Sequence, residues 1–136
     1  MCWRPRWGSR FVPEIDGREG GLIAWQWAIY ASGHTTRANL LIHILTVPMF
    51  QLGTLTLLVL VAMASPYAVG GGAMMVGAMA AQGRGHAGEP QPPVRFRGPL
   101  DVIARIMAEQ WIAFPRFVLT GGFARGWKSA ASKSNQ

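Results

Sequence analysis

The three histidines of this chain are the residues whose type and spacing point most directly to chemistry. His34 and His43 lie around the start of a long uncharged stretch, residues 38–83, and His86 follows its end. Imidazole is the commonest protein ligand for metal ions. The only cysteine, Cys2, cannot build a thiolate cage, so a metal bound here must use histidine, carboxylate or water.

The spacing of His34 and His43 requires a break in the backbone between them. On one continuous α-helix, two residues nine positions apart would point in opposite directions and lie ~13 Å apart along the axis. Gly33, however, suits a left-handed cap at the end of a short apolar helix over residues 22–32, and a threonine that follows can cap the next helix. His34 then lies in a turn and can fold back towards His43.

The uncharged stretch is long and apolar enough to cross a membrane. Half of the chain is apolar and only 14% of it is charged, against about 25% in soluble proteins. A helix of ~20 apolar residues spans the ~30 Å hydrocarbon core, and Ser65-Pro66 marks a turn within the stretch. We therefore predict an all-α membrane protein with one transmembrane helical hairpin, spanning at about residues 37–64 and 66–82, and flanking interfacial helices. Small residues recur at every fourth position of the return span and are expected to allow its close approach to the first: Ala73, Gly77 and Ala81.

The other segments frame this hairpin within a single helical membrane domain, residues 21–128. Residues 1–20 form a basic leader that contains tryptophans, and residues 129–136 form a polar tail that we expect to be disordered. A loop rich in Gly, Pro and Arg is predicted over residues 83–99. An amphipathic helix over residues 101–114 is expected to lie in the membrane interface over the histidines.

The net charge of +7 is distributed in a way that indicates membrane topology. Every Lys and Arg lies outside the uncharged stretch, on both sides of it. By the positive-inside tendency both termini and the histidines face the cytoplasm, and without a recognisable signal peptide the expected location is a bacterial inner membrane. Nucleic-acid binding is not expected, because the basic residues form no soluble patch with interleaved aromatics. Whether the chain forms a homo-oligomer stays open.

Three polar side chains close to the histidines in sequence are candidates for a supporting role. Asn39 shares a helix face with His43, four residues further on, and could orient its imidazole. Gln82 could form a hydrogen bond across the hairpin or cap the return helix. Tyr30 could donate to bound oxygen or belong to an aromatic belt at the membrane surface.

Together these residues resemble the 2-hydroxy fatty acid dioxygenase family, whose characterised fungal member is an endoplasmic-reticulum protein of phytosphingosine breakdown. The shared pattern, within about residues 25–100, is Tyr30-x3-His34-x4-Asn39-x3-His43-x4-Pro48 and, after a hairpin, Gln82-x2-Gly85-His86-x2-Glu89. The family commonly has its glutamate four residues after the Gly-His pair, one position later than Glu89, and the fungal form has more spans. The resemblance implies that His34, His43 and His86 bind iron(II), with Glu89 or water as a further ligand.

The activity implied by the resemblance is the α-oxidation of a long-chain 2-hydroxy fatty acid by O2, which gives the acid one carbon shorter. Neutral imidazoles with at most one carboxylate suit Fe(II) and leave positions open for oxygen and substrate. Arg37 or Arg84, close to the histidines in sequence, could pair with the carboxylate of a lipid-phase substrate or could only set the membrane topology.

Two other readings of the histidines stay open. In one, a small non-enzymatic membrane protein, such as a lipid-binding or assembly subunit, uses them to close a polar packing cluster. In the other, two of them are the axial ligands of a b-type haem.

Overall fold

The computed structural model describes Arg18 and residues 20–133, and every regular element in this part of the chain is a helix. Along the chain they are α1 (Gly21–Tyr30), the 3-10 turn η1 (Ala31–Gly33), α2 (Arg37–Ala62), α3 (Ala68–Ala87), α4 (Pro99–Ala108), the π-helix η2 (Glu109–Ala113), α5 (Phe114–Leu119) and α6 (Gly122–Lys133). The predicted all-α class is confirmed. The predicted leader lies almost entirely outside the described residues.

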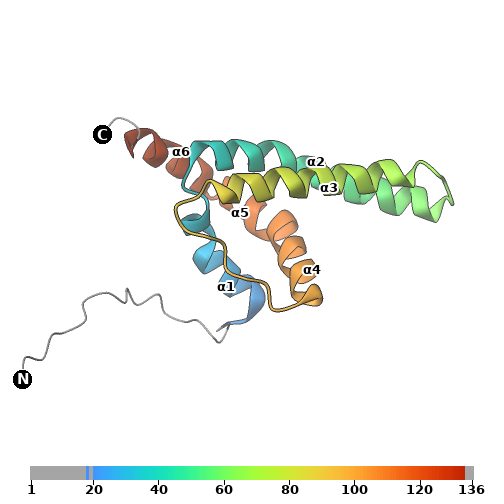
Figure 1. Ribbon diagram of the computed structural model, residues 1–136, viewed down its shortest axis with the longest axis horizontal. Coiled ribbons are helices and arrows are strands. Elements are labelled where there is room, and N and C mark those ends of the chain that lie inside the picture. The colour runs from blue at the N-terminus through green and yellow to red at the C-terminus, as the bar shows by residue number, and fades with distance from the viewer. Residues whose placement is uncertain (1–17, 19, 134–136) are drawn as a thin grey trace, which may run out of the picture.

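The helices α2 and α3 lie side by side as an antiparallel pair joined by residues 63–67 (Figure 1). Glycines allow their close contact near the turn. A Cβ atom built on Gly71 would lie 2.6 Å from the backbone nitrogen of Leu57, and one on Gly53 would lie 2.8 Å from the carbonyl oxygen of Gly71. Because backbone atoms cannot give way as side-chain ends do, a side chain at either glycine would push the helices apart.

The face of α3 that packs on α2 differs from the predicted one. Its buried small residues are Gly71, Ala78 and Gly85, which recur at every seventh position. Gly77, in contrast, is exposed, and its Cβ position would only touch the end of the Met49 side chain. The period of seven is the one expected for two long helices that stay in contact over their length.

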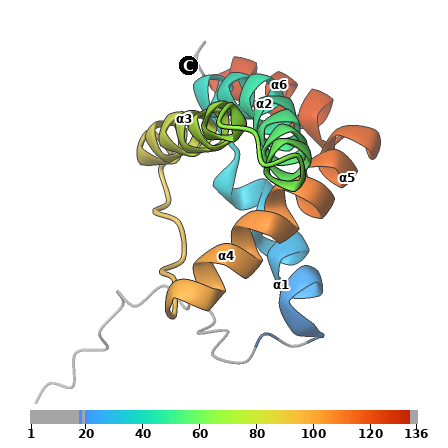
Figure 2. The ribbon, with the colours of Figure 1, turned by 90° about the vertical axis from the view of Figure 1, so that its right-hand side faces the viewer.

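The remaining helices gather at the end of the pair where α2 begins and α3 ends, and the other end projects from this body (Figure 1). Figure 2 shows α1 and α4 below the pair and α6 beside α2. The buried core lies where α1, α2, η2 and α5 meet: Tyr30, Leu40, Val47, Ala113, Phe114 and Phe117.

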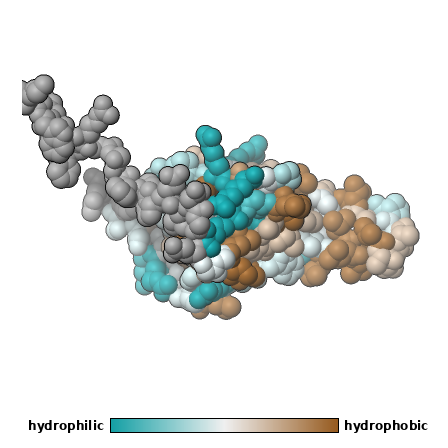
Figure 3. Space-filling model, turned by 90° about the horizontal axis from the view of Figure 1, so that it is seen from below, coloured by the Kyte–Doolittle hydropathy of each residue, from teal (hydrophilic) through white to brown (hydrophobic). Residues whose placement is uncertain are grey.

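Among the described residues, α2 is the one helix long and apolar enough to cross a membrane. Only a minor part of the most apolar stretch of this helix is buried inside the protein. Leu45, Leu52 and Leu58 stay 71%, 58% and 61% exposed, and Figure 3 shows apolar side chains along the projecting end of the pair. Since the core helix of a soluble protein buries such side chains, this exposure favours contact with lipid. By the same criterion of length and hydropathy, α3 does not qualify as a membrane span, so a transmembrane hairpin remains a prediction.

Three local features differ from the prediction, and the first two concern the segments that carry His34 and His86. Gly33 does not adopt a left-handed conformation, because the chain leaves α1 through the 3-10 turn η1. The helix α3 continues to Ala87, so His86 lies on a helix and not in a loop. At the far end α6 runs to Lys133, into the segment predicted to be a disordered tail.

Candidate metal centre

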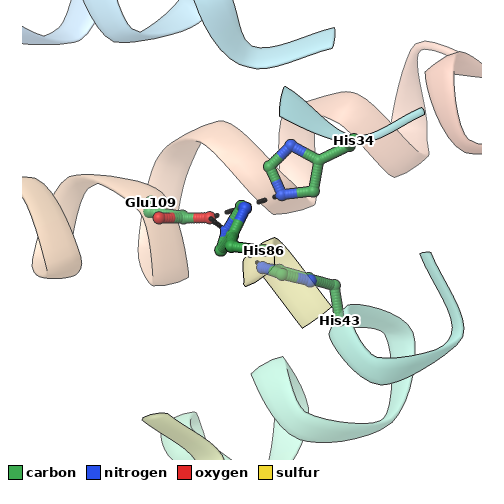
Figure 4. Close-up of side chains that lie close together, drawn as sticks. All are labelled: His34, His43, His86 and Glu109. Carbon is green, nitrogen blue, oxygen red and sulfur yellow. Dashed lines mark ion pairs between the residues drawn. The ribbon is translucent and has the colours of Figure 1, made fainter. Parts of the chain in front are cut away.

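Four side chains from four separate segments point towards one another in the body of the protein (Figure 4). His34 follows η1, His43 lies on α2, His86 on α3 and Glu109 on η2, and one ligand atom from each lies within 4.8 Å of all the others. The distances from Glu109 Oε1 to the three Nε2 atoms are 3.5 Å for His34, 3.4 Å for His43 and 3.9 Å for His86. We refer to these four residues as the His3Glu cluster.

These separations fit a metal ion better than direct hydrogen bonds. A hydrogen bond from nitrogen to oxygen is typically ~2.9 Å long, shorter than any of the three distances. Two ligand atoms that each lie ~2.1 Å from one metal are ~3.4 Å apart at a tetrahedral angle. The distances from Glu109 to the three imidazoles are thus close to those between ligands of one metal, and the cluster could hold an ion through three nitrogens and one oxygen.

Backbone carbonyls fix the orientation of two of the imidazoles. His34 Nδ1 lies 2.8 Å from the backbone oxygen of Tyr30, and His43 Nδ1 lies 2.9 Å from the backbone oxygen of Asn39. In both cases the carbonyl is four residues earlier in the chain. Since a carbonyl only accepts, both Nδ1 atoms must carry the proton, which in the neutral ring leaves the Nε2 lone pair facing Glu109. Metal-binding histidines are commonly oriented in this way.

The converging atoms lack partners of their own. His34 Nε2, His43 Nε2 and Glu109 Oε1 are all buried and form no hydrogen bond. A buried polar atom without a partner costs about 1–3 kcal/mol. Three such atoms around one point are best explained by a cation that binds all of them.

The protonation states also suit a cation. Burial lowers the pKa of His34 by more than the carboxylate of Glu109 raises it, which keeps the imidazole neutral. For Glu109, burial alone would raise the pKa of the carboxyl, but hydrogen bonds and positive charge at the facing imidazoles lower it well below its usual range. A cation bound between neutral imidazoles acts on this pKa in the same direction. A neutral imidazole and an ionised carboxylate are the forms that bind metals.

Glu89, the predicted carboxylate ligand, lies outside the His3Glu cluster and organises the start of α2. Its carboxylate accepts hydrogen bonds from the backbone N–H and hydroxyl groups of Thr35 and Thr36 and from the side-chain amide of Asn39, at 2.6–3.1 Å. Partial burial alone would raise the pKa of Glu89, but these hydrogen bonds lower it to about 2. Because Thr36 is the N-cap of α2, Glu89 fixes the turn that carries His34.

Asn39 supports His43 differently from what was predicted. Its side-chain amide donates hydrogen bonds to the backbone oxygen of Gly33 at 3.0 Å and to the carboxylate of Glu89 at 2.9 Å. Its backbone carbonyl accepts a hydrogen bond from Nδ1 of His43. A Cβ atom on Gly85 would lie 2.4 Å from Asn39 Oδ1, so a glycine at this position lets α3 approach. Asn39 thus connects the turn before α2 to the imidazole one helical turn later.

Glu109 is the candidate ligand that sequence reasoning missed, because the amphipathic pattern of residues 101–114 places it on the polar side of a surface helix. The helix widens to a π-helix at Glu109, a deviation that is frequent at functional sites. The signal available in the sequence was an acid directly followed by Gln110 within an otherwise apolar segment, and Gln110 is fully buried. Buried polar groups of this kind mark places where a helix serves more than packing.

Gln82 forms the predicted hydrogen bond across the α2–α3 pair, but its partner is Thr46 and not Asn39 or an imidazole. Its amide nitrogen donates to Thr46 Oγ1 at 3.0 Å and to Gln110 Oε1 at 3.1 Å, and it accepts from Gln110 Nε2 at 2.6 Å. Gln51 of α2 donates to the backbone oxygen of Gln110 at 2.7 Å. Both α2 and α3 therefore hold the π-helix that presents Glu109.

Tyr30 lies in the core and not in a surface belt. It is 4% exposed, its ring is stacked on His34 with centroids 4.1 Å apart, and its hydroxyl is buried without a partner. Arg37 and Arg84 are both exposed. The guanidinium of Arg37 lies 4.8 Å from the ring centre of Trp127, and Arg84, two positions before His86, points to the opposite side of α3.

Comparisons of the chain with models of protein families, with curated proteins and with solved structures give no match. The geometry of the His3Glu cluster and the residue pattern in the sequence are therefore the two observations that bear on function.

Proposed function

We propose that the His3Glu cluster holds one iron(II) ion and that the protein uses it, with O2, to shorten a lipid-phase 2-hydroxy fatty acid by one carbon. The observation that carries this proposal is the convergence of three buried, unpartnered ligand atoms from His34, His43 and Glu109. The choice of substrate is supported by the resemblance of the histidine pattern to the 2-hydroxy fatty acid dioxygenases.

The donor set suits iron(II) and disfavours calcium and magnesium, which prefer oxygen ligands only. Catalytic zinc sites use the same imidazole and carboxylate donors, so the choice of iron(II) over zinc rests on the resemblance to the dioxygenases. Imidazoles combined with one carboxylate are the set found in non-haem iron(II) oxygenases. When bound, iron(II) would supply the activation of O2 that an acid with no reactive double bond requires.

The chain's own residues would keep this chemistry in a defined, dry environment. The ionised Glu109 offsets part of the charge of a divalent ion, and His34 is held between the Tyr30 carbonyl and the Tyr30 ring. Phe114 and Phe117 pack near the rings of His43 and His34, with centroids 6.1 and 6.3 Å apart. These aromatic side chains exclude water from one side of the cluster.

The position of the cluster suits a substrate that partitions into lipid. It lies where α2 begins and α3 ends, at the base of the projecting apolar pair (Figures 1 and 4). If α2 crosses a membrane, as its length and composition allow, the cluster lies at the membrane surface. We propose that this is the cytoplasmic surface of a bacterial inner membrane, because the basic residues flank the span.

Atom balance defines the products of the proposed reaction. One 2-hydroxy acid and one O2 give the acid one carbon shorter, one CO2 and one water. The bond that breaks joins the carboxyl carbon to the hydroxyl-bearing carbon, which is oxidised to the new carboxylate while O2 is reduced.

The geometry favours a bare ion over haem. The centroids of the three imidazole rings lie 4.5, 4.9 and 4.9 Å apart. A porphyrin plane would have to pass between two axial imidazoles, and these separations leave no room for it. A purely structural polar cluster is also disfavoured, since such a cluster would pair its buried atoms with one another.

The test is to load the detergent-purified protein with Fe(II) without oxygen, determine bound iron per chain, and then measure O2 consumption with 2-hydroxyhexadecanoate. We expect one iron per chain and equal amounts of O2 consumed, CO2 released and pentadecanoate formed. Hexadecanoate, which lacks the hydroxyl, is the matched substrate control. Bound iron without turnover would overturn the proposed substrate, and absence of stoichiometric iron would favour the structural alternative.

A further inference from the structure

A cavity of about 270 Å³ adjoins the His3Glu cluster. One wall is the turn that holds His34 and Thr35, a second is the Phe117 ring, and the third is a face of α6 formed by Gly122, Arg125 and Gly126. His34 therefore belongs both to the cluster and to the cavity wall, and the cavity adjoins the segment that carries this member of the cluster.

The α6 wall carries a positive charge. Gly122 lies against the Phe117 ring and Gly126 lies near Leu40, so the two glycines let α6 pack closely on α5 and α2. Between them in sequence, Arg125 donates from Nη1 to the carbonyl oxygen of Thr120 at 2.9 Å, which holds its side chain beside the end of α5. Its remaining guanidinium donors are available to a ligand.

Among the described residues, no carboxylate lies at the cavity to balance its positive charge. The residues that line it include no Asp or Glu. Within the described part of the chain the acidic groups form their ion pairs with Arg18, Arg105 and the histidines of the cluster, and none pairs with Arg125. A cavity with one arginine and no acid attracts an anion, and a guanidinium matches a carboxylate with two parallel hydrogen bonds.

We propose that this cavity binds the carboxylate end of the acyl substrate and that Arg125 is its partner. The inference rests on the proposed function and adds to it the residue that recognises the acid. A volume of about 270 Å³ holds a carboxylate and a few carbons but not a long acyl chain, so the tail must leave the cavity towards the apolar surface. The hydroxyl-bearing carbon, next to the carboxylate, then lies on the His34 side.

The two arginines that the sequence suggested as partners of the substrate carboxylate lie away from this cavity. Neither Arg37 nor Arg84 lines the cavity, and Arg37 is stacked on Trp127. Arg125 lies 91 positions after His34, and the two residues line one cavity because α6 packs against α2.

The test measures binding of 2-hydroxyhexadecanoate to the Fe(II)-loaded, detergent-solubilised protein by calorimetry in the absence of O2, so that turnover does not enter. Arg125→Gln is compared with Lys128→Gln, which removes a positive charge from an exposed position of the same helix. We expect Arg125→Gln to weaken binding of the acid roughly 10- to 100-fold, Arg125→Lys to retain part of the affinity, and Lys128→Gln to leave it unchanged. The methyl ester of the acid, which has no charge, should bind wild type and Arg125→Gln equally.

Iron content per chain provides the check that each variant is folded, since none of these changes touches a proposed ligand. Equal affinity of wild type and Arg125→Gln for the acid would overturn the carboxylate site while leaving the proposed function standing. An equal loss for the acid and its methyl ester would also overturn it. Failure of the iron-loaded wild type to bind the acid at all would instead overturn the substrate in the proposed function.

Discussion

The side-chain amides of Gln82 and Gln110 exchange two hydrogen bonds in the interior, at 3.1 and 2.6 Å. Gln82 lies on α3 one turn before His86, and Gln110 directly follows Glu109 on the π-helix. The pair therefore ties the helix that carries one proposed ligand to the segment that carries another. Because the amides are complementary and buried, this link fixes the distance between the two more firmly than apolar packing alone.

Gln82→Leu should weaken metal binding although Gln82 is not a ligand. The change leaves the Gln110 amide buried and unpaired and frees the π-helix, and loss of a residue that orients a ligand typically costs about 10- to 100-fold in metal affinity. Competition with a chelator gives the iron(II) affinity. In the double variant Gln82→Leu/Gln110→Leu the thermal stability should recover relative to the single variant while metal affinity stays low. Parallel recovery of both quantities would show that the pair serves stability alone.

The crossing of α2 and α3 gives a prediction with a matched control on the same helix. Gly71→Ala places a Cβ atom 2.6 Å from the Leu57 backbone nitrogen, so the helices must separate, at a cost of about 1–3 kcal/mol. Gly72→Ala meets no atom within 4 Å, and the higher helix propensity of alanine should stabilise it by up to ~1 kcal/mol. Thermal unfolding of the two variants in detergent should therefore shift in opposite directions. A shift in the same direction would contradict this packing.

The convergence of the three histidines was predictable because local signals determine it. The helical period, the cap at Thr36 and the uncharged stretch place His43 and His86 at one end of an antiparallel pair, and the break after α1 returns His34 to them. Even where a detail was wrong, as for the conformation of Gly33, the presence of a break was sufficient.

The carboxylate was not predictable from the same signals. Glu89 is three residues after His86, and the resemblance to the dioxygenase family suggested that it is a ligand. The free N–H groups at the start of α2 bind Glu89 instead, since an unpaired carboxylate and the unpaired donors of a helix N-terminus satisfy each other. Glu109 reaches the histidines through packing between segments distant in sequence and through a π-helix, and neither leaves a periodic pattern in the chain.

The capping role of Glu89 predicts how stability depends on pH. The pKa of Glu89 is about 2 in the folded protein against an ordinary value of 4.5. Because folding favours the ionised form, the stabilisation is complete above pH ~4.5 and is lost as the pH falls towards ~2. Thermal unfolding of the metal-free protein across this range should show a steeper decline for wild type than for Glu89→Gln, which has no group to titrate at this position. Parallel curves would mean that the carboxylate does not cap α2.

The assignment of Glu109 as the ligand and Glu89 as the cap predicts opposite consequences of one chemical change at two positions. Glu109→Gln keeps the shape of the side chain but removes the charge that faces His34 and His43 at 3.5 and 3.4 Å, so iron(II) affinity should fall by at least 10-fold. Glu89→Gln keeps the ligands but leaves donors of Thr35 and Thr36 unsatisfied, so it should lower the unfolding temperature and leave iron per folded chain near wild type. Iron content and thermal unfolding, measured on both variants, separate the two roles, and loss of iron in Glu89→Gln with retention in Glu109→Gln would reverse the assignment.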